Sequence, residues 1–319
     1  MSITAALQVA SHLTHQAPLP GRGETRRRWQ VLATLAERDL TLARVTEAHL
    51  DAVAILAEAG TSVPAGTTWG VFAAEAPAAR LEEHDGVLQG TGPWCSLADD
   101  LSHALVTAHT PAGRRLFAVD LAAGRAAGTV EVETGTWHSR GLVDVPSGPV
   151  HFRGAPAEPV GEVGWYLQRP GFAHGGIGVA ACWFGGAVGV ARPLLTSDRD
   201  DPLTRRSRGL VDLRLQVARL ALDAAASAVD TGRAVGAAGE LLAARTRSIV
   251  AAACEDVVTE VGHALGPAPL TFDAAHAARV ADLTVYLRQH HAARDVAAVG
   301  EMVGELLDKT GPEETRWPW

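Results

Sequence analysis

The pattern of apolar residues changes twice along this chain, and the order of those changes limits the folds that it can adopt. Residues 31–60 carry leucine, valine and alanine at three- and four-residue spacing, which predicts helix, and Gly60 ends the run. Residues 62–160 hold short apolar runs separated by glycine, proline, aspartate and serine, which is typical of a compact antiparallel sheet or barrel. From residue 161 the helical pattern returns. The order predicts a multi-domain α+β protein with a small β domain between two helical parts.

The C-terminal part predicts a four-helix bundle, because long periodic segments are joined by short connections. The predicted helices cover 173–195, 207–231, 233–265 and 273–308. The polar residues 18–28 predict a loop that leads into the first helical region. We therefore expect a helical domain over 1–61, a central β domain over 62–160, the bundle over 161–308 and a tail over 309–319.

Composition narrows the classes of function. The formal net charge of −8 argues against a general nucleic-acid surface, which needs a basic face. The sole lysine is Lys309, which argues against catalysis through a lysine Schiff base. The cysteines at 95, 182 and 254 are far apart, so we expect neither a zinc ribbon nor a disulfide framework, and a reducing cytoplasm is the expected location. The first residues lack the pattern of a signal peptide.

Two local features could suggest other classes of protein. Residues 175–191 form a stretch of 17 without a charge, at the lower limit for a membrane span. A helix buried on all sides within a bundle has the same composition, and we expect that arrangement and no span. Asp99 and Asp100 with His103 could suggest a metal, but their spacing matches no recognised ligand set, so we expect a solvated turn and no metal.

The segment 90–108 carries the most specific chemical signal. It joins a glycine turn, the triplet Trp94, Cys95 and Ser96, and a strand pattern. An indole can cover a flat heterocycle, while a hydroxyl and backbone amides bind its polar edge. A flavin is such a heterocycle. The alternative is that Trp94 only fills the edge of the barrel.

This segment also resembles a known flavin-binding turn. Residues 85–96, DGVLQGTGPWCS, are similar to the flavin-binding turn of the acyl-CoA dehydrogenase family, with Gly92 where the family has lysine. Other segments resemble further parts of that family, namely 73–80, 130–172 and 279–300. The resemblance covers about residues 37–300 and implies the family's architecture, in which FAD lies between the β domain and the bundle. The N-terminal helical domain is short compared with that of the family.

The resemblance implies which residues bind the cofactor. Trp94, Cys95 and Ser96 would line the flavin, with the indole shielding the isoalloxazine and Ser96 reaching the N5–O4 edge. Ala74 stands where the family has a flavin-contacting threonine. Arg206 belongs to an arginine cluster that we expect in a loop, from which it would reach the pyrophosphate of FAD on a partner subunit. The alternative for Arg206 is a solvated, charged loop.

The catalytic positions depart from the family. Asp282 matches an aspartate of its last helix, and counting forward places His290 where the family has its glutamate base, followed by His291 in place of glycine. Some members carry the glutamate on an earlier helix, but residues 175–184 contain no carboxylate. His290 is therefore one candidate base, since a neutral imidazole accepts a proton near neutral pH. His174, expected where the β domain meets the bundle, is the other. Either ring could instead be held by structural hydrogen bonds.

The resemblance implies an FAD-dependent oxidoreductase that transfers a hydride from an acyl thioester, or a related acyl chain, to flavin N5. Its implied partners are an acyl-CoA-like substrate, an electron-transfer flavoprotein and further copies of the chain in a homodimer or homotetramer. Two alternatives stay open. One is a flavin-dependent monooxygenase of the same fold, which needs no α-proton base. The other is a non-catalytic assembly or binding subunit, which the altered segment 73–80 and the missing glutamate favour.

Overall fold

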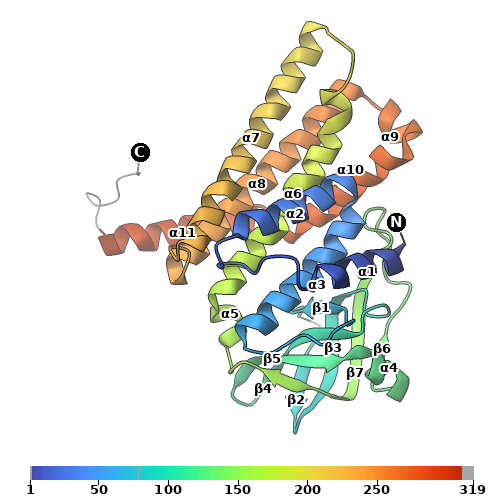
Figure 1. Ribbon diagram of the computed structural model, residues 1–319, viewed down its shortest axis with the longest axis vertical. Helices are drawn as coiled ribbons and strands as arrows, with labels where there is room; N and C mark the ends of the chain where they lie inside the picture. Colours follow the sequence, from blue (N-terminus) through green and yellow to red (C-terminus); the bar gives the residue numbers. More distant parts are fainter. Residues whose placement is uncertain (1, 78, 311–319) are drawn as a thin grey trace.

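The computed structural model describes residues 2–77 and 79–310, and it places helices above one side of a twisted sheet (Figure 1). The chain begins with three helices: α1 (Ile3–Leu13), α2 (Thr25–Arg38) and α3 (Leu40–Glu58). Strands follow, and helices form the rest of the described chain. This order confirms the predicted α+β fold. The tail expected over 309–319 lies, from residue 311 onward, outside the described residues.

The first helical region is two helices where the periodicity predicted one. Asp39 separates them, because its backbone is extended and its carboxylate caps α3 by accepting a hydrogen bond from Leu42 N at 3.0 Å. α2 already begins at Thr25, so the loop predicted over 18–28 ends earlier than expected. α3 packs against α1, α2 and two later helices, and it also contacts the first strand. It therefore lies at the centre of the molecule.

The central region forms a single sheet of eight strands within the described residues, in the order β6-β7-β3-β2-β4-β5-β8, with β1 paired to β4. The strands are β1 (Trp69–Phe72), β2 (Leu81–His84), β3 (Val87–Ser96), β4 (His103–Thr110), β5 (Gly113–Asp120), β6 (Val130–Val132), β7 (Ser147–Pro156) and β8 (Glu158–Val160). One short helix, α4 (Leu121–Ala127), interrupts them. Both β1 and β2 run parallel to β4, which corrects the expectation of a purely antiparallel sheet.

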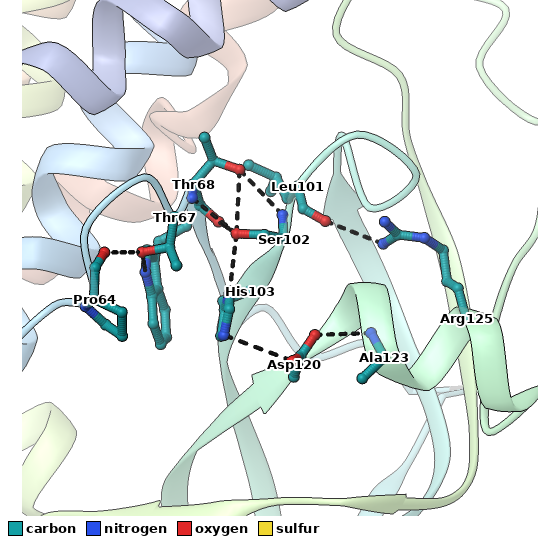
Figure 2. Close-up of polar contacts among 10 residues, drawn as sticks. Pro64, Thr67, Thr68, Leu101, Ser102, His103, Asp120, Ala123 and Arg125 are labelled. Atoms are coloured by element: carbon teal, nitrogen blue, oxygen red, sulfur yellow. Dashed lines mark hydrogen bonds and ion pairs between the residues drawn. The ribbon is translucent and has the colours of Figure 1, made fainter.

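The loop between α3 and β1 is fastened to the start of β4, as Figure 2 shows. Ser102 Oγ donates to the Thr68 carbonyl at 2.9 Å, and Ser102 N donates to Thr68 Oγ1 at 3.1 Å. His103 Nδ1 lies 2.9 Å from Ser102 Oγ, and its Nε2 lies 3.9 Å from Asp120 Oδ2. These contacts hold the loop against β4, and they give His103 partners other than the acidic turn at residues 99–100.

The C-terminal part is built around one long, buried helix. Its helices are α5 (Trp165–Gln168), α6 (Pro170–Leu195), α7 (Pro202–Asp230), α8 (Gly236–Leu265), α9 (Ala268–Phe272), α10 (Ala274–Tyr286) and α11 (Ala293–Thr310). α6 packs against α2, α7 and α8, and its glycines permit close approach: a Cβ at Gly185 would lie 2.1 Å from the Ala33 carbonyl oxygen. α6 is long and apolar enough to cross a membrane, but 72% of its apolar window is buried in the fold, which agrees with a buried bundle helix.

The helix predicted over 273–308 is broken. α10 ends at Tyr286, a 3₁₀ turn (η1, Leu287–Gln289) follows, and α11 begins only at Ala293. His290 has an extended backbone, and Ala292 has a left-handed φ of 47°. Among the described residues, the bundle therefore contains three long helices, α6 to α8, while α11 packs against α8 (Figure 1). This corrects the expectation of one continuous helix over 273–308.

Candidate functional site

A bulge in β3 sets the direction of Trp94. Gly92 and Cys95 are three residues apart on β3, but their partners on β7 are only two apart, so one extra residue is inserted. Such a bulge locally turns the strand and redirects its side chains. Pro93 is tolerated there, because a bulge does not need the N–H that proline lacks. As a result, Trp94 is 57% exposed while the next side chain, Cys95, is buried.

Trp94 lines a cleft of about 650 Å³ between the sheet and the helices. The β side of the cleft includes Ala74, Trp94 and Ser96. The helical side includes residues of α3, together with His291 from the segment between η1 and α11. The structure therefore brings three of the predicted cofactor positions together in one cleft.

Ser96 is held on two sides, by Ser147 and by Arg44. Its Oγ lies 2.7 Å from Ser147 Oγ and accepts a hydrogen bond from Arg44 Nη2 at 3.3 Å. A hydroxyl has one hydrogen and two lone pairs, and Ser147 Oγ also lies 3.4 Å from the Val145 carbonyl, so either serine can be the donor of the pair. Ser96 offers its O–H to a ligand in the cleft when Ser147 is the donor.

Behind Ser96, α3 carries a buried ionic cluster that our sequence reasoning missed. Arg44 pairs with Glu47 at 3.1 Å, and Tyr286 donates to Glu47 Oε2 at 3.2 Å. Burial raises the pKa of Glu47, although Arg44 opposes that effect. Asp51 lies one turn further along α3 and also lines the cleft. The sequence contains a pattern that could have revealed this cluster. Arg44, Glu47 and Asp51 are spaced by three and four residues, which puts three charges on one face of a mostly apolar helix.

A second cavity of about 570 Å³ adjoins the cleft. Asp51, Tyr166 and Val179 line both spaces, so the two are neighbours. The second cavity extends between the first turns of α6, α8 and α11, and His290 lies in its wall. A small ligand in the cleft would thus have further space beside it, within the usual size range of ligand sites.

His290 lies in the second cavity, but its ring is fully engaged. Ala292 N donates to Nδ1 at 3.2 Å, and Nε2 lies 3.1 Å from Ser248 Oγ. A neutral imidazole has one accepting nitrogen, so Nδ1 is that acceptor and Nε2 carries the hydrogen. Burial also lowers the pKa of His290, which keeps the ring neutral. The ring has no free lone pair for a substrate proton, which favours the structural alternative for His290 over its role as a candidate base.

Two further predicted residues lie outside both cavities. The Cys95 side chain is 2% exposed, and its thiol donates to the Gly92 carbonyl at 3.5 Å. The thiol therefore packs inside the β domain and does not face the cleft. His174 is also buried, and its Nε2 donates to the Ala234 carbonyl at 3.0 Å. It fastens α6 to the connection between α7 and α8.

Arg206 lies on a helix and not in a loop. α7 begins at Pro202, because Asp201 caps it with hydrogen bonds from Leu203 N and Thr204 N. Arg206 pairs with Glu260 at 3.1 Å across to α8. The start of α7 is at the end of the bundle opposite the sheet (Figure 1), so Arg206 does not line the cleft of its own chain.

The residues of the cleft fit the isoalloxazine ring of a flavin. The exposed face of Trp94 offers a flat apolar surface, and Val71 and Leu142 add apolar contacts. Polar residues, Ser96 and Gln289, line the same cleft. A planar ring with a polar edge matches this combination of surfaces.

The solved structures that this chain resembles include dehydrogenases and a monooxygenase. The chain matches no protein-family model and no curated protein sequence. It is similar to butyryl-CoA dehydrogenase from Megasphaera elsdenii, with a TM-score of 0.78 and 14% identity over 94% of this chain and 90% of that chain. It is also similar to dibenzothiophene monooxygenase from Paenibacillus sp. A11-2, with a TM-score of 0.67 and 17% identity over 93% of this chain and 96% of that one.

A third similar structure contains a flavin. It is a glutaryl-CoA dehydrogenase from Mycobacterium smegmatis in complex with FADH2, with a TM-score of 0.72 and 12% identity over 94% of this chain and 88% of that chain. At such identities, the likeness concerns the arrangement of helices and strands along nearly the whole chain. This protein has the acyl-CoA dehydrogenase fold.

Proposed function

We propose that this protein binds FAD in the cleft and oxidises an acyl thioester or a related acyl chain. The observation that supports this most directly is the exposed Trp94 indole, which a bulge turns toward the same cleft as Ser96 and Ala74. Bound flavin supplies a hydride acceptor at N5. Trp94 would cover one face of the ring, and the Ser96 hydroxyl would bind its polar edge.

The second cavity accommodates the acyl group in this proposal. Its wall includes the apolar side chains of Leu167, Phe172 and Met302, and it opens from the cleft beside Val179. An acyl chain there would lie next to a flavin in the cleft, which excludes water from the reacting carbons. An electron-transfer flavoprotein as acceptor and a homo-oligomeric assembly remain part of the proposal.

A monooxygenase is the second candidate function. The hydrogen bonds of His290 favour it, since that ring has no lone pair free and an oxygenase needs no base for an α proton. The similarity of the fold to that of dibenzothiophene monooxygenase also favours this second candidate. Ala74, where the resemblance implied a flavin-contacting threonine, instead favours a non-catalytic subunit.

The visible spectrum of the purified protein, followed by anaerobic titration, tests these functions. Flavin absorbance that is bleached by an acyl-CoA thioester is the expected result. Flavin that resists every thioester, but consumes oxygen and hydroxylates an added substrate after reduction by a reductase, would establish the monooxygenase. A colourless protein that takes up no FAD would overturn both enzymatic functions and leave the assembly role.

A further inference from the structure

Asp51 lies where the two cavities meet, since it lines both of them. Its side chain is partly buried. Within residues 2–77 and 79–310, no donor forms a hydrogen bond with its carboxylate and no cation lies within ion-pair distance of it. Withdrawing a carboxylate from water without a partner is costly. The position of Asp51 therefore calls for a reason other than stability.

The carboxylate lies directly against the backbone of α6. A Cβ built at Gly175 would be only 2.5 Å from Asp51 Oδ1, which is closer than atoms can approach without a shift. The absence of a side chain at Gly175 thus leaves the space that the Asp51 carboxylate fills. α6 carries no carboxylate of its own between Pro170 and Leu195, so α3 supplies an acid at the surface of α6 that faces both cavities.

On the basis of the proposed function, we propose that Asp51 is the base that takes the α proton of the acyl substrate. In this step the α C–H bond breaks and its proton goes to an oxygen of Asp51. The electron pair of that bond becomes the second bond between the α and β carbons. The β hydrogen leaves as a hydride, with its electron pair, to the oxidised flavin that the proposed function requires.

The surroundings of Asp51 suit a proton acceptor. Burial raises its pKa, and the guanidinium groups of Arg169, Arg28 and Arg44 only partly offset this effect, while Glu58 adds to it. A carboxylate with a raised pKa is a stronger base, and general bases work best when their pKa approaches the working pH. The neighbouring arginines limit the rise, so the carboxylate stays available to accept a proton.

The two nearby histidines are less suited to this role. His290 has both ring nitrogens in hydrogen bonds. The His291 ring pairs with Asp295 Oδ1 at 3.1 Å through Nδ1. Its side chain is also 54% exposed, at the edge of the cleft. Asp51 lies deeper, at the boundary shared by the two cavities.

The first test compares FAD-loaded wild-type protein with Asp51→Asn, which keeps the shape of the side chain. Butyryl-CoA and longer saturated acyl-CoA thioesters are added anaerobically, and the rate of flavin bleaching is followed. Solvent deuterium incorporation at the α carbon is measured separately with dithionite-reduced protein, in which no hydride can be transferred. We expect both rates to fall by about 100-fold or more, the usual contribution of a general base. FAD content should stay at the wild-type level.

The second test uses the contact with α6. Gly175→Ala should displace the Asp51 carboxylate and slow the deuterium incorporation as Asp51→Asn does, with FAD retained. Gly178→Ala is the matched control, because its Cβ would meet only ordinary contacts of 3.6 Å and longer, and Gly178 lines neither cavity. Infrared spectra of the flavin-free protein should also contain a protonated carboxyl band, titrating above the ordinary range of aspartate, that Asp51→Asn removes.

The outcomes separate the two proposals. If wild-type protein is bleached by a thioester and Asp51→Asn is bleached at the same rate, the assignment of Asp51 is wrong and the proposed function stands. If only His291→Gln slows the deuterium incorporation, the base is His291. If no thioester bleaches the wild-type flavin, the proposed function is wrong and the assignment of Asp51 is wrong with it.

Discussion

Arg44 Nη2 donates a hydrogen bond to Ser96 Oγ at 3.3 Å, so the buried ionic cluster of α3 reaches the wall of the cleft. The same guanidinium pairs with Glu47 at 3.1 Å and lies 5.8 Å from the centre of the Tyr286 ring. A positive charge therefore lies behind the hydroxyl that we assign to the polar edge of the flavin. This contact links the stability of the helical core to the binding of the cofactor.

Replacing Arg44 with methionine should destabilise the protein and weaken FAD binding. The variant leaves the Glu47 carboxylate buried without its cation, and breaking such a pair costs about 3 kcal/mol. Urea unfolding of the flavin-free protein measures the loss, and FAD titration measures the affinity. The double variant Arg44→Met with Glu47→Gln should recover most of the stability but not the affinity. A single variant as stable as the wild type would contradict the structural role of the pair.

Trp94→Ala should weaken FAD binding without destabilising the fold. The side chain is 57% exposed, so its removal should change the free energy of unfolding by no more than about 0.5 kcal/mol. Loss of aromatic stacking should raise the Kd for FAD about 5-fold to 10-fold. Fluorescence titration with FAD checks this. Phe272→Ala is the control, because Phe272 is 86% exposed and lies outside the cleft. Equal effects of the two variants would exclude a specific contact between Trp94 and flavin.

The local sequence pattern was sufficient to predict the order of helices and strands and to identify the segment that contains Trp94 and Ser96. Helical periodicity predicted α6 to within a few residues, since glycine and polar connections mark its ends. The flavin-binding roles of Trp94, Ser96 and Ala74 stay predictions, although the structure places all three in one cleft. These residues are close in the sequence or belong to strands of one sheet, so a linear pattern could identify them.

Features that depend on distant contacts could not be predicted in this way. The break at His290 contains neither glycine nor proline, and it is held by Ser248 from α8 and by the Trp183 ring, whose centre is 6.3 Å away. Asp51 and Gly175 are adjacent only because α3 packs on α6. The search for a carboxylate on the bundle helices therefore missed the one that α3 brings to α6.

His290→Ala should reduce stability, because His290 joins three parts of the helical core. The change leaves the partly buried Ala292 N and Ser248 hydroxyl without their partner, and unpaired groups of this kind cost about 1 kcal/mol or more. Chemical denaturation of the flavin-free protein measures this loss. His291→Ala is the matched control: that side chain is 54% exposed, so we expect a change within about 0.5 kcal/mol. A His290 variant of unchanged stability would contradict the structural role.

Asp51→Asn should be more stable than the wild type at neutral pH. Burial raises the pKa of Asp51 in the folded protein, so the folded state holds the proton more tightly than the unfolded state does. The contribution of this carboxyl to stability is then favourable at low pH and is lost as the pH rises through the folded-state pKa. Asparagine carries no charge at any pH. The variant should gain stability near pH 7, and the two proteins should converge below about pH 4, where aspartate is protonated in both states.

Asp201→Ala should show the opposite dependence on pH. Hydrogen bonds from the Thr204 hydroxyl and from the Thr204 and Leu203 amides lower the pKa of Asp201 to about 2. Its stabilising effect is therefore present above the ordinary pKa of aspartate and is lost as the pH falls through the folded-state value. Denaturation curves of both variants from acid to neutral pH distinguish the two signs. If Asp51→Asn also lost stability toward neutral pH, Asp51 would be a structural carboxylate. A gain would mean that the protein retains this acid at a cost in stability, as expected for a group kept for its chemistry.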